Sequence, residues 1–495
     1  MKFPNLSRRS FVASLFTLFL ANSCKKLPAT APASNAVTPP LEQPPVADAS
    51  VLAQYTVTEL GNKANLFPLP DFFKQINYGY CDKTSYNPGD EVQFYLTGPK
   101  NNDHKIDLVD INGVSVFSFS SAISPQQIKS AKPWVEGCMF DKTTSVRIPN
   151  GIKSGFYTWK LGSKSVHENI PVVIKSADNF PEVTVVYASN TDNAYNLGGG
   201  KSLYGPSVED RCTVASFLRF PFSPVDYTSS FFKWMSLQSY NANFVADVDL
   251  DDYATIQNSK IVILTGHSEY WTKQARLNID KFVDSGKNLL VLSGNTMWWQ
   301  VRYNLEKNLM ICTKDHVSDP LSNTIYNTQQ WPTPALRYPT TSSVGVDWNG
   351  GGYGNQLANR WNGFKIVQEK SPLFEGTELK NGDILKLPSN EIDGAPVVKM
   401  IMPGSDEIPV IDNSKLNFYK VELLAFDFAV NGTKPNGLGT FIVFKKKAKS
   451  GTVVNAATTD WCSPKGIGGS DHEKIAIITK NMIDKSLAGK SLLTS

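Results

Sequence analysis

Residues 261–294 read IVILTGHSEYWTKQARLNIDKFVDSGKNLLVLSG. They contain two continuous apolar runs, 261–264 and 289–292, on either side of a stretch with helical spacing. Continuous apolar runs are typical of strands that are buried on both faces. In the stretch between them, Thr272 can cap a helix and Gly286 can end it. The segment therefore predicts a right-handed strand–helix–strand crossover within a parallel sheet.

Similar patterns extend this unit in both directions along the chain. Apolar runs recur at 183–187 and 441–444, and the helical spacing of 475–487 predicts a closing C-terminal helix. Between about residues 75 and 175 the pattern changes to short alternating segments that are separated by turn residues. This alternation predicts an antiparallel, Ig-like β-sandwich. We therefore expect a sandwich domain over residues 51–178 and an α/β domain over residues 179–495.

Residues 1–24 have the composition of an export signal. A basic start with Arg8 and Arg9 precedes an apolar run over residues 11–21. That run is too short to cross about 30 Å of hydrocarbon as a helix. Residues 7–12 resemble a twin-arginine signal, and an ordinary secretory leader that contains two arginines is the alternative.

Residues 20–24 also resemble a lipoprotein cleavage box that ends at Cys24, although Asn22 is unusual there. Acylation of Cys24 and plain cleavage are the two alternatives, and stable anchoring would need more than one acyl chain. Residues 25–50 contain six prolines and six alanines and predict an extended linker. We expect an exported protein of the periplasm or cell envelope, with a lipid anchor if Cys24 is acylated.

The composition excludes some classes of protein. Hydrophobic residues make up 41% of 495 residues, which excludes a wholly disordered chain. Lysines and arginines number 49 and acidic residues 45, so the charge gives no argument for nucleic-acid binding.

Five cysteines follow the leader, and none forms the C-x-x-C pair of a structural zinc site. In an oxidising compartment, placement in the predicted domains suggests the pairs Cys81–Cys138 and Cys312–Cys462, which would leave Cys212 free.

Polar groups and large aromatic side chains follow the predicted parallel strands, at the edge where ligands of such sheets bind. Residues 265–271 follow the first strand of the crossover, and residues 293–299 follow the second. Residues 190–204, with three successive glycines at 198–200, are expected to form a flexible third wall. These glycines lack the spacing of a phosphate-binding Walker loop.

Two familiar hydrolase mechanisms do not fit the end of the first strand. A glutamine-amidotransferase mechanism needs a thiol at the strand-to-helix turn, where this chain has residues 267–269, HSE. The nucleophile turn of serine hydrolases reads Gly-x-Ser-x-Gly, and residues 266–270, GHSEY, break that motif at its last position. Ser268 is therefore not expected to be a nucleophile.

Five motifs occur in order along the chain: 193–204 (NAYNLGGGKSLY), 266–271 (GHSEYW), 292–302 (LSGNTMWWQVR), 390–393 (NEID) and 455–461 (NAATTDW). Together they resemble the C-terminal domain of proteins similar to the large (β) subunit of N,N-dimethylformamidase, over roughly residues 180–490. The resemblance implies a flavodoxin-like or glutamine-amidotransferase-like sheet behind a β-sandwich. It also implies a small partner subunit.

The resemblance implies an iron site as well, because the characterised family member is an amide hydrolase whose iron is held by two tyrosines and one glutamate. Tyr270 and Glu391 match two of these ligands. The second tyrosine stays open between Tyr195 and Tyr240, and Tyr195 is favoured because it is expected at the same edge of the sheet. Phenolate and carboxylate oxygens are hard ligands that suit Fe3+, which can lower the pKa of a bound water.

His267, Glu269 and Asn295 are the expected catalytic residues, and His267 or Glu269 could shuttle protons. Each expected site residue also has a structural alternative: Tyr270 could pack on the following helix, Glu391 could lie in a solvated turn, and His267 could make only local hydrogen bonds.

The main functional hypothesis is hydrolysis of a C–N bond in a small or polar amide. The rival hypothesis is a non-catalytic envelope protein that binds carbohydrate or another polar ligand through exposed aromatic side chains. The candidates for that role are Trp271, Trp298, Trp299 and Trp361.

Overall fold

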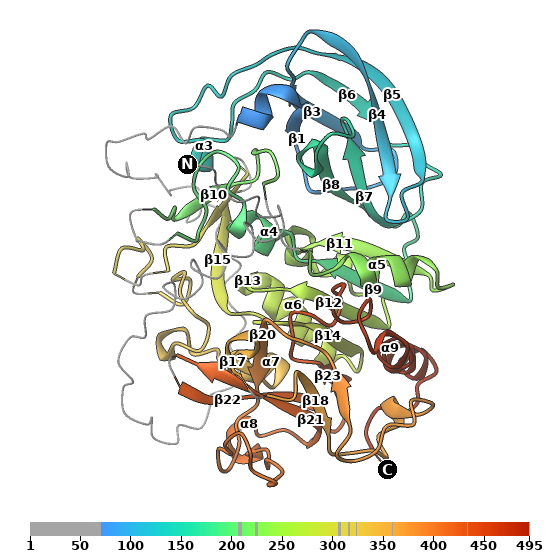
Figure 1. The fold of residues 1–495 in the computed structure, drawn as a ribbon, viewed down its shortest axis with the longest axis vertical. Helices are drawn as coiled ribbons and strands as arrows, with labels where there is room; N and C mark the ends of the chain where they lie inside the picture. Colours follow the sequence, from blue (N-terminus) through green and yellow to red (C-terminus); the bar gives the residue numbers. More distant parts are fainter. Residues whose placement is uncertain are drawn as a thin grey trace, which may run out of the picture.

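The computed structural model describes residues 71–494, apart from 206–209, 223–225, 305–307, 315–316, 323, 359 and 433. The expected export signal, the linker and residues 51–70 lie outside this part. Figure 1 shows an all-β unit, coloured blue to cyan, packed on a larger unit that contains the remaining strands and most helices.

The N-terminal unit is a β-sandwich, as the alternating pattern predicts. One sheet has the order β1 (Tyr78–Cys81), β3 (Glu91–Thr97), β6 (Thr144–Arg147). The other has the order β2 (Ser85–Tyr86), β8 (Asn169–Ile174), β7 (Gly155–Lys160), β4 (Asn102–Asp110), β5 (Ser115–Ile123). Alternate side chains such as Val92, Phe94 and Trp159 fill the space between the sheets. The sandwich is not wholly antiparallel, because β2 pairs in parallel with β8.

Five parallel strands form one half of the main sheet of the second unit. Their order is β11 (Ala242–Ala246), β9 (Val183–Tyr187), β12 (Ile261–His267), β14 (Asn288–Gly294), β23 (Thr452–Asn455). Since β9 precedes β11 in the chain, the strand order reverses between β9 and β12. Such a reversal is the point at which open parallel sheets bind ligands, beyond the carboxyl ends of the strands.

The other half of the main sheet is antiparallel. It continues from β23 through β22 (Lys434–Lys445), β21 (Lys420–Asn431), β17 (Asp347–Tyr353) and β20 (Glu391–Gly394), with β18 (Gly363–Ile366) on β21 and β19 (Ile384–Lys386) on β18. The apolar run 441–444 lies in β22 and is buried on both faces as predicted, although β22 pairs antiparallel with its neighbours. An apolar run reports burial on both faces and carries no information on strand direction.

The predicted crossover is confirmed as β12, α6 (Lys273–Asp284) and β14. Thr272 caps α6, because its Oγ1 accepts a hydrogen bond of 3.0 Å from the Ala275 N–H. Gly286 follows the helix with φ +96°, a conformation that glycine adopts at low cost.

A second, smaller sheet was not predicted. Its order is β10 (Val214–Ser216), β16 (Leu309–Ile311), β15 (Trp299–Asn304), β13 (Tyr270–Thr272). The chain leaves β12, forms β13 and only then enters α6. The parallel pairing of β13 with β15 sets Tyr270 opposite Trp299.

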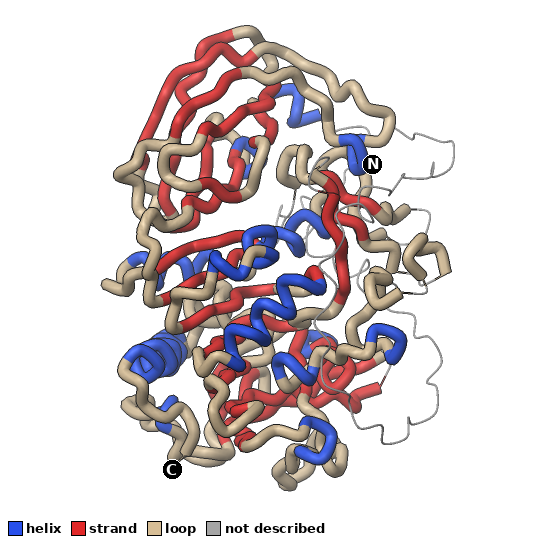
Figure 2. Tube along the Cα trace, turned by 180° about the vertical axis from the view of Figure 1, so that it is seen from behind, coloured by secondary structure: helices blue, strands red, loops and turns tan. Residues whose placement is uncertain are grey.

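Helices cover both faces of the parallel strands, and Figure 2 shows them lying across the sheet. Ile261 and Ile263 of β12 pack in one hydrophobic cluster with α5 (Ser229–Ser236) and α9 (His472–Leu487). Val262 and Leu264 point the other way and pack with α6. The predicted C-terminal helix is therefore confirmed. The other helices are α3 (Pro133–Glu136), α4 (Ser189–Tyr195), α7 (Thr341–Val344) and α8 (Asn413–Leu416).

The five described cysteines are buried free thiols, so the suggested disulfide pairing is wrong. Cys81 lies in the core of the sandwich, whereas Cys138 belongs to a separate cluster of aromatic side chains. Cys312 and Cys462 likewise lie in different clusters of the α/β domain. Within the described ranges, no helix has the length and apolar character needed to cross a bilayer.

Candidate functional site

Glu269 is the centre of a buried hydrogen-bond cluster between β12 and β13. Its Oε2 accepts a hydrogen bond of 3.0 Å from the Tyr195 hydroxyl, at the end of α4. Its Oε1 accepts one of 2.9 Å from Trp299 Nε1 and another from the Tyr204 hydroxyl. The side chain is 1% exposed. Three donors from separate parts of the chain therefore fix the carboxylate in position.

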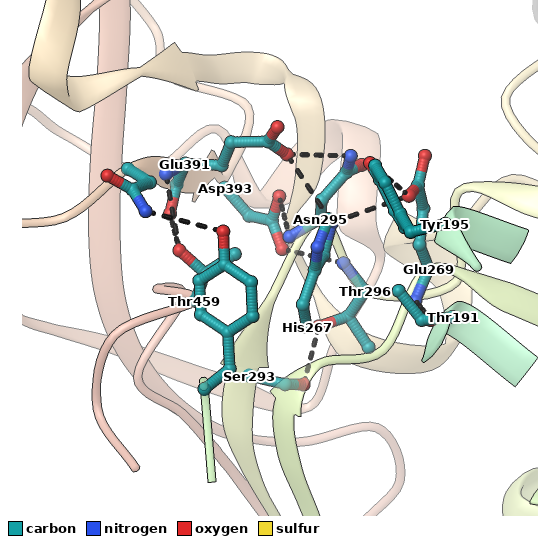
Figure 3. A network of polar contacts seen from close by, with 12 residues as sticks. Thr191, Tyr195, His267, Glu269, Ser293, Asn295, Thr296, Glu391, Asp393 and Thr459 are labelled. Atoms are coloured by element: carbon teal, nitrogen blue, oxygen red, sulfur yellow. Dashed lines mark hydrogen bonds and ion pairs between the residues drawn. The ribbon is translucent and has the colours of Figure 1, made fainter. Parts of the chain in front are cut away.

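His267, the last residue of β12, lies between Glu269 and a second carboxylate. Its Nε2 is 3.4 Å from Glu269 Oε2 and 3.7 Å from Glu391 Oε2. Among the described residues no atom makes a hydrogen bond with this nitrogen, although the side chain is only 6% exposed. Burial lowers the imidazole pKa, while the charge of Glu269 opposes that shift. Figure 3 shows the imidazole facing both carboxylates.

Glu391, the first residue of β20, is held by the end of β14. Asn295 Nδ2 donates a hydrogen bond of 2.8 Å to Glu391 Oε2. The backbone of Asn295 has φ +48°, and this turn directs its N–H and that of Thr296 to the Asp393 carboxylate, at 3.0 and 3.1 Å. Burial and the nearby charge of Glu269 raise the pKa of Glu391 well above its ordinary value. Glu391 is therefore a buried acid and not the solvated turn residue of the alternative interpretation.

Tyr270 follows Glu269 in the chain and is the first residue of β13. Its side chain is fully buried, and its hydroxyl has no hydrogen-bond partner in the described part of the chain. The ring of Tyr204 stands edge-on to it at 6.3 Å between centroids. Lys314 places its ammonium 3.5 Å from the ring centroid of Tyr204 and 5.3 Å from that of Tyr270, a cation–π arrangement.

The structure separates the two candidates for the second tyrosine. Tyr195 belongs to the Glu269 cluster, and its ring stacks on that of Tyr204 with centroids 4.0 Å apart. Tyr240 instead donates a hydrogen bond of 2.6 Å to Asp484 of α9. Tyr195 is thus the candidate that meets Glu269 and His267. No hydrogen bond, ion pair or ring contact joins Tyr270 to Glu391 among the residues that the structure describes.

A cavity of about 410 Å³ lies between the sandwich and the α/β domain. On the α/β side it is lined by Tyr187 to Ser189 at the end of β9, by Tyr227 and by His267. Phe156 and Thr158 of β7 line the opposite side. The cavity therefore reaches the reversal point between β9 and β12, and His267 connects it to the two carboxylates.

The sequence of the chain matches a known protein family. A family model described as N,N-dimethylformamidase beta subunit-like, C-terminal, matches residues 116–465, which is more than half of the chain. The chain belongs to this family. No curated protein matches the sequence. The match begins inside β5 and ends before α9, so in this dimethylformamidase-like chain the family region includes β6, β7, β8 and most of β5 of the sandwich and the α/β domain as far as residue 465.

The candidate donor atoms of this dimethylformamidase-like chain are of the chemical type that an iron ion prefers. Phenol and carboxylate oxygens gather around Glu269, and the buried Tyr270 hydroxyl has no other partner among the described residues. In that same part of the chain, no group of three or more histidine, cysteine, aspartate or glutamate side chains has the arrangement of a metal site. An ion at this position would therefore depend on tyrosine ligands.

The aromatic residues expected to be exposed are mostly packed inside. Trp271 is 1% and Trp298 3% exposed, and Trp271 Nε1 donates to the Ser268 carbonyl oxygen at 2.9 Å. Trp361 packs against Phe426 with ring centroids 5.1 Å apart. Of the four, only Trp299 contacts the carboxylate cluster. An aromatic platform for carbohydrate made by Trp271 and Trp298 is therefore excluded.

The glycine-rich wall is also firmer than expected. Arg219 is buried, and its NH1 donates to the carbonyl oxygens of Asn196, Gly198 and Lys201 at 2.8 to 3.0 Å. One guanidinium thus clamps the loop that carries the three glycines. These hydrogen bonds come from a residue about 20 positions later and restrain the loop that the glycines led us to expect to be flexible.

Several residues of the site were not predicted. Tyr204 and Asp393 are the last residues of two of the recognised motifs, and that position was the available signal. Tyr227, whose ring lies 5.3 Å from that of His267, and Lys314 lie outside all the motifs and carry no local pattern that marks them.

Proposed function

We propose that this dimethylformamidase-like protein hydrolyses the C–N bond of a small polar amide. The observation that supports it best is the position of His267 Nε2, 3.4 and 3.7 Å from two buried carboxylates and at the wall of the cavity. Burial keeps the imidazole neutral and able to accept a proton. The charge of the neighbouring Glu269 then favours the imidazolium that results. This is the arrangement needed for general acid–base catalysis.

In the proposed reaction, His267 takes a proton from water as the water oxygen bonds to the amide carbon. The C–N bond breaks, and the imidazolium returns the proton to the leaving nitrogen, which yields a carboxylic acid and an amine. Glu269 stabilises the imidazolium through its charge. Asn295, expected to be catalytic, acts here as a positioning residue, because its amide N–H is committed to Glu391.

Iron remains part of the proposal. Tyr270, Tyr195 and Glu391 would hold it, since their oxygens are the hard donors that Fe3+ prefers. When bound, such an ion would act as a Lewis acid that polarises the amide carbonyl. Metal analysis and a phenolate-to-iron absorption band test this point. Tyr270→Phe should abolish the band, whereas the control Tyr240→Phe should keep it, because Tyr240 is paired with Asp484. A colourless, iron-free protein from iron-replete cells would remove the ion from the proposal.

The hydrolase itself is tested by release of dimethylamine from N,N-dimethylformamide and of ammonia from formamide and acetamide. His267→Gln should lower the rate by about a hundredfold or more. His472→Gln is the matched control, since His472 lies at the start of α9 and is exposed. Absence of dimethylamine or ammonia release from all three amides with the metal-loaded protein, or full activity of His267→Gln, would refute the assignment.

We also propose export to the cell envelope, a flavodoxin-like parallel half sheet and an Ig-like sandwich. Residues 1–24 support the export, and the strand order β11, β9, β12, β14, β23 supports the sheet type. The family description names a beta subunit, which supports a small partner subunit. Cys24→Ser should release the protein from the membrane fraction if Cys24 is acylated, and should leave its location unchanged if the leader is simply cleaved.

A further inference from the structure

The cavity between the two domains has a polar end at which the proposed reaction uses only His267. That end lies at the carboxyl end of β9, where residues 187–189, Ser229 and Asp192 line the wall together with His267. The sandwich covers it from the other side with Phe156, whose ring lies 5.0 Å from that of Tyr187. A ligand here would be enclosed by both domains.

Two buried polar atoms at this end lack partners. Ser189 is 3% exposed, and its Oγ makes no hydrogen bond with any described residue. His267 Nε2 is the second such atom. Buried polar groups are nearly always hydrogen-bonded in native proteins. His267 Nε2 already faces Glu269 and Glu391, so Ser189 Oγ, in a residue of the cavity wall, is the atom whose missing partner a ligand here would supply.

Two carboxylates give the same end a negative charge. Asp192 accepts a hydrogen bond from the Tyr187 hydroxyl at Oδ2, and its Oδ1 accepts none from the described residues. Asp226 is exposed; its Oδ1 accepts the N–H groups of Thr228 and Ser229 at 3.1 and 2.9 Å, and its Oδ2 accepts the Ser229 hydroxyl. Burial and the charge of Asp226 raise the pKa of Asp192 to about 6. The two acids are thus close enough to repel each other.

The basic groups of the cavity wall do not neutralise this end by direct contact. Arg219 donates its N–H groups to protein oxygens, which include the backbone carbonyl of Ser216 and the side chain of Asn193. Lys83 belongs to the sandwich wall, where its ammonium faces the ring of Tyr86. Burial lowers the pKa of His167 and keeps it neutral. A cationic ligand would therefore find Asp192 Oδ1 unoccupied and, within the described part of the chain, no basic group of the wall paired with either carboxylate.

We propose that the cavity binds the substrate of the proposed hydrolase and selects an amide that carries an ammonium group. Asp192 and Asp226 pair with the ammonium, Ser189 adds a hydrogen bond, and the amide group lies against His267. The proposal rests on the proposed function for the identity of the reacting group. The ammonium contact itself depends only on the cavity.

Three acetamides of similar length and different charge test this proposal with the full chain: N-(2-aminoethyl)acetamide, N-propylacetamide and N-acetylglycine. Calorimetric titration should show that the cation binds about tenfold more tightly than the neutral amide. An ammonium–carboxylate hydrogen bond contributes about that much affinity. The anion should bind most weakly. Asp192→Asn and Asp226→Asn should each remove most of the advantage of the cation and leave the neutral amide unchanged.

Asp226→Asn keeps a side chain that can cap the N–H groups of α5, so it separates a charge effect from misfolding. Asp103→Asn, on the exposed start of β4, is the control that should change nothing. Equal affinities for the three amides, or an unchanged preference in both variants, would overturn the proposal. Amine release measured alongside separates the two ideas. Preferred binding of the cation without release refutes the hydrolase alone, and release without charge preference refutes the ammonium contact alone.

Discussion

Removal of the Glu269 side chain should cost more stability than any conservative change at the same position. In Glu269→Ala, the hydroxyls of Tyr195 and Tyr204 and the indole N–H of Trp299 lose their acceptor. Each buried donor left unsatisfied costs about 1 to 3 kcal/mol. Water that enters the vacated space satisfies some of them, and the lost charge relieves Glu391, so we expect a net loss of about 3 to 5 kcal/mol.

Glu269→Gln is the informative companion. Glutamine keeps the shape and one acceptor oxygen, and its amide can donate to a tyrosine hydroxyl that rotates, so the loss should be about 1 kcal/mol. Urea unfolding followed by tryptophan fluorescence gives the free energies. Glu407→Ala is the control, because its ion pair with Lys399 is exposed and contributes about 0 to 1 kcal/mol. If the alanine variant lost no more stability than the glutamine variant, Glu269 would not be the acceptor on which the cluster depends.

Other parts of the fold give further tests. Arg302→Met should lower the free energy of unfolding in urea by about 3 to 5 kcal/mol. Arg302 NH2 lies 2.8 Å from the Asp319 carboxylate, and the substitution leaves that buried charge without its cation. A loss below about 1 kcal/mol would contradict this. Gly294→Ala should prevent stable folding, since a Cβ there would lie 2.4 Å from the Thr459 backbone nitrogen, and a soluble variant with an unchanged Tm would disprove the close approach. Asp347→Asn should stabilise the protein by about 1 to 3 kcal/mol at pH 7.5 and by nothing at pH 3.5. Burial raises the pKa of Asp347 to about 6, so the wild type loses stability as pH rises from about 4, where the unfolded carboxyl ionises, to about 6; the same difference at both pH values would refute this.

The sequence predicted those features that depend on neighbours along the chain. The crossover from β12 to β14 follows from two apolar runs and a cap at Thr272, all within 34 residues. The alternation of the sandwich is equally local. Strand β13 was missed because it has only three residues, the last of which caps α6, and so short a segment shows no alternation of apolar and polar residues.

The site was predictable only in part, because its contacts are made between distant segments. Tyr204 and Glu269 are 65 positions apart, and Asn295 and Glu391 are 96 apart. Motif resemblance named Tyr195, His267, Glu269, Asn295 and Glu391, and the structure brings these five together. The recognised motifs did not reveal that Glu269, and not a tyrosine, is the centre of the cluster. The pocket expected at this edge of the sheet was predicted without the wall that the sandwich gives to the cavity.

Strands β7 and β8 of the sandwich form one wall of the cavity, and the carboxylates near His267 belong to the other domain. Phe156 and Thr158 of β7 and Ile170 of β8 line the cavity, while Glu269 and Glu391 come from the other domain. Substitutions at these sandwich positions can change the shape of the cavity without touching Glu269, Glu391 or the acids Asp192 and Asp226. Under the proposed function, evolution or a library confined to these few codons could therefore vary which amides fit while the α/β side stays constant.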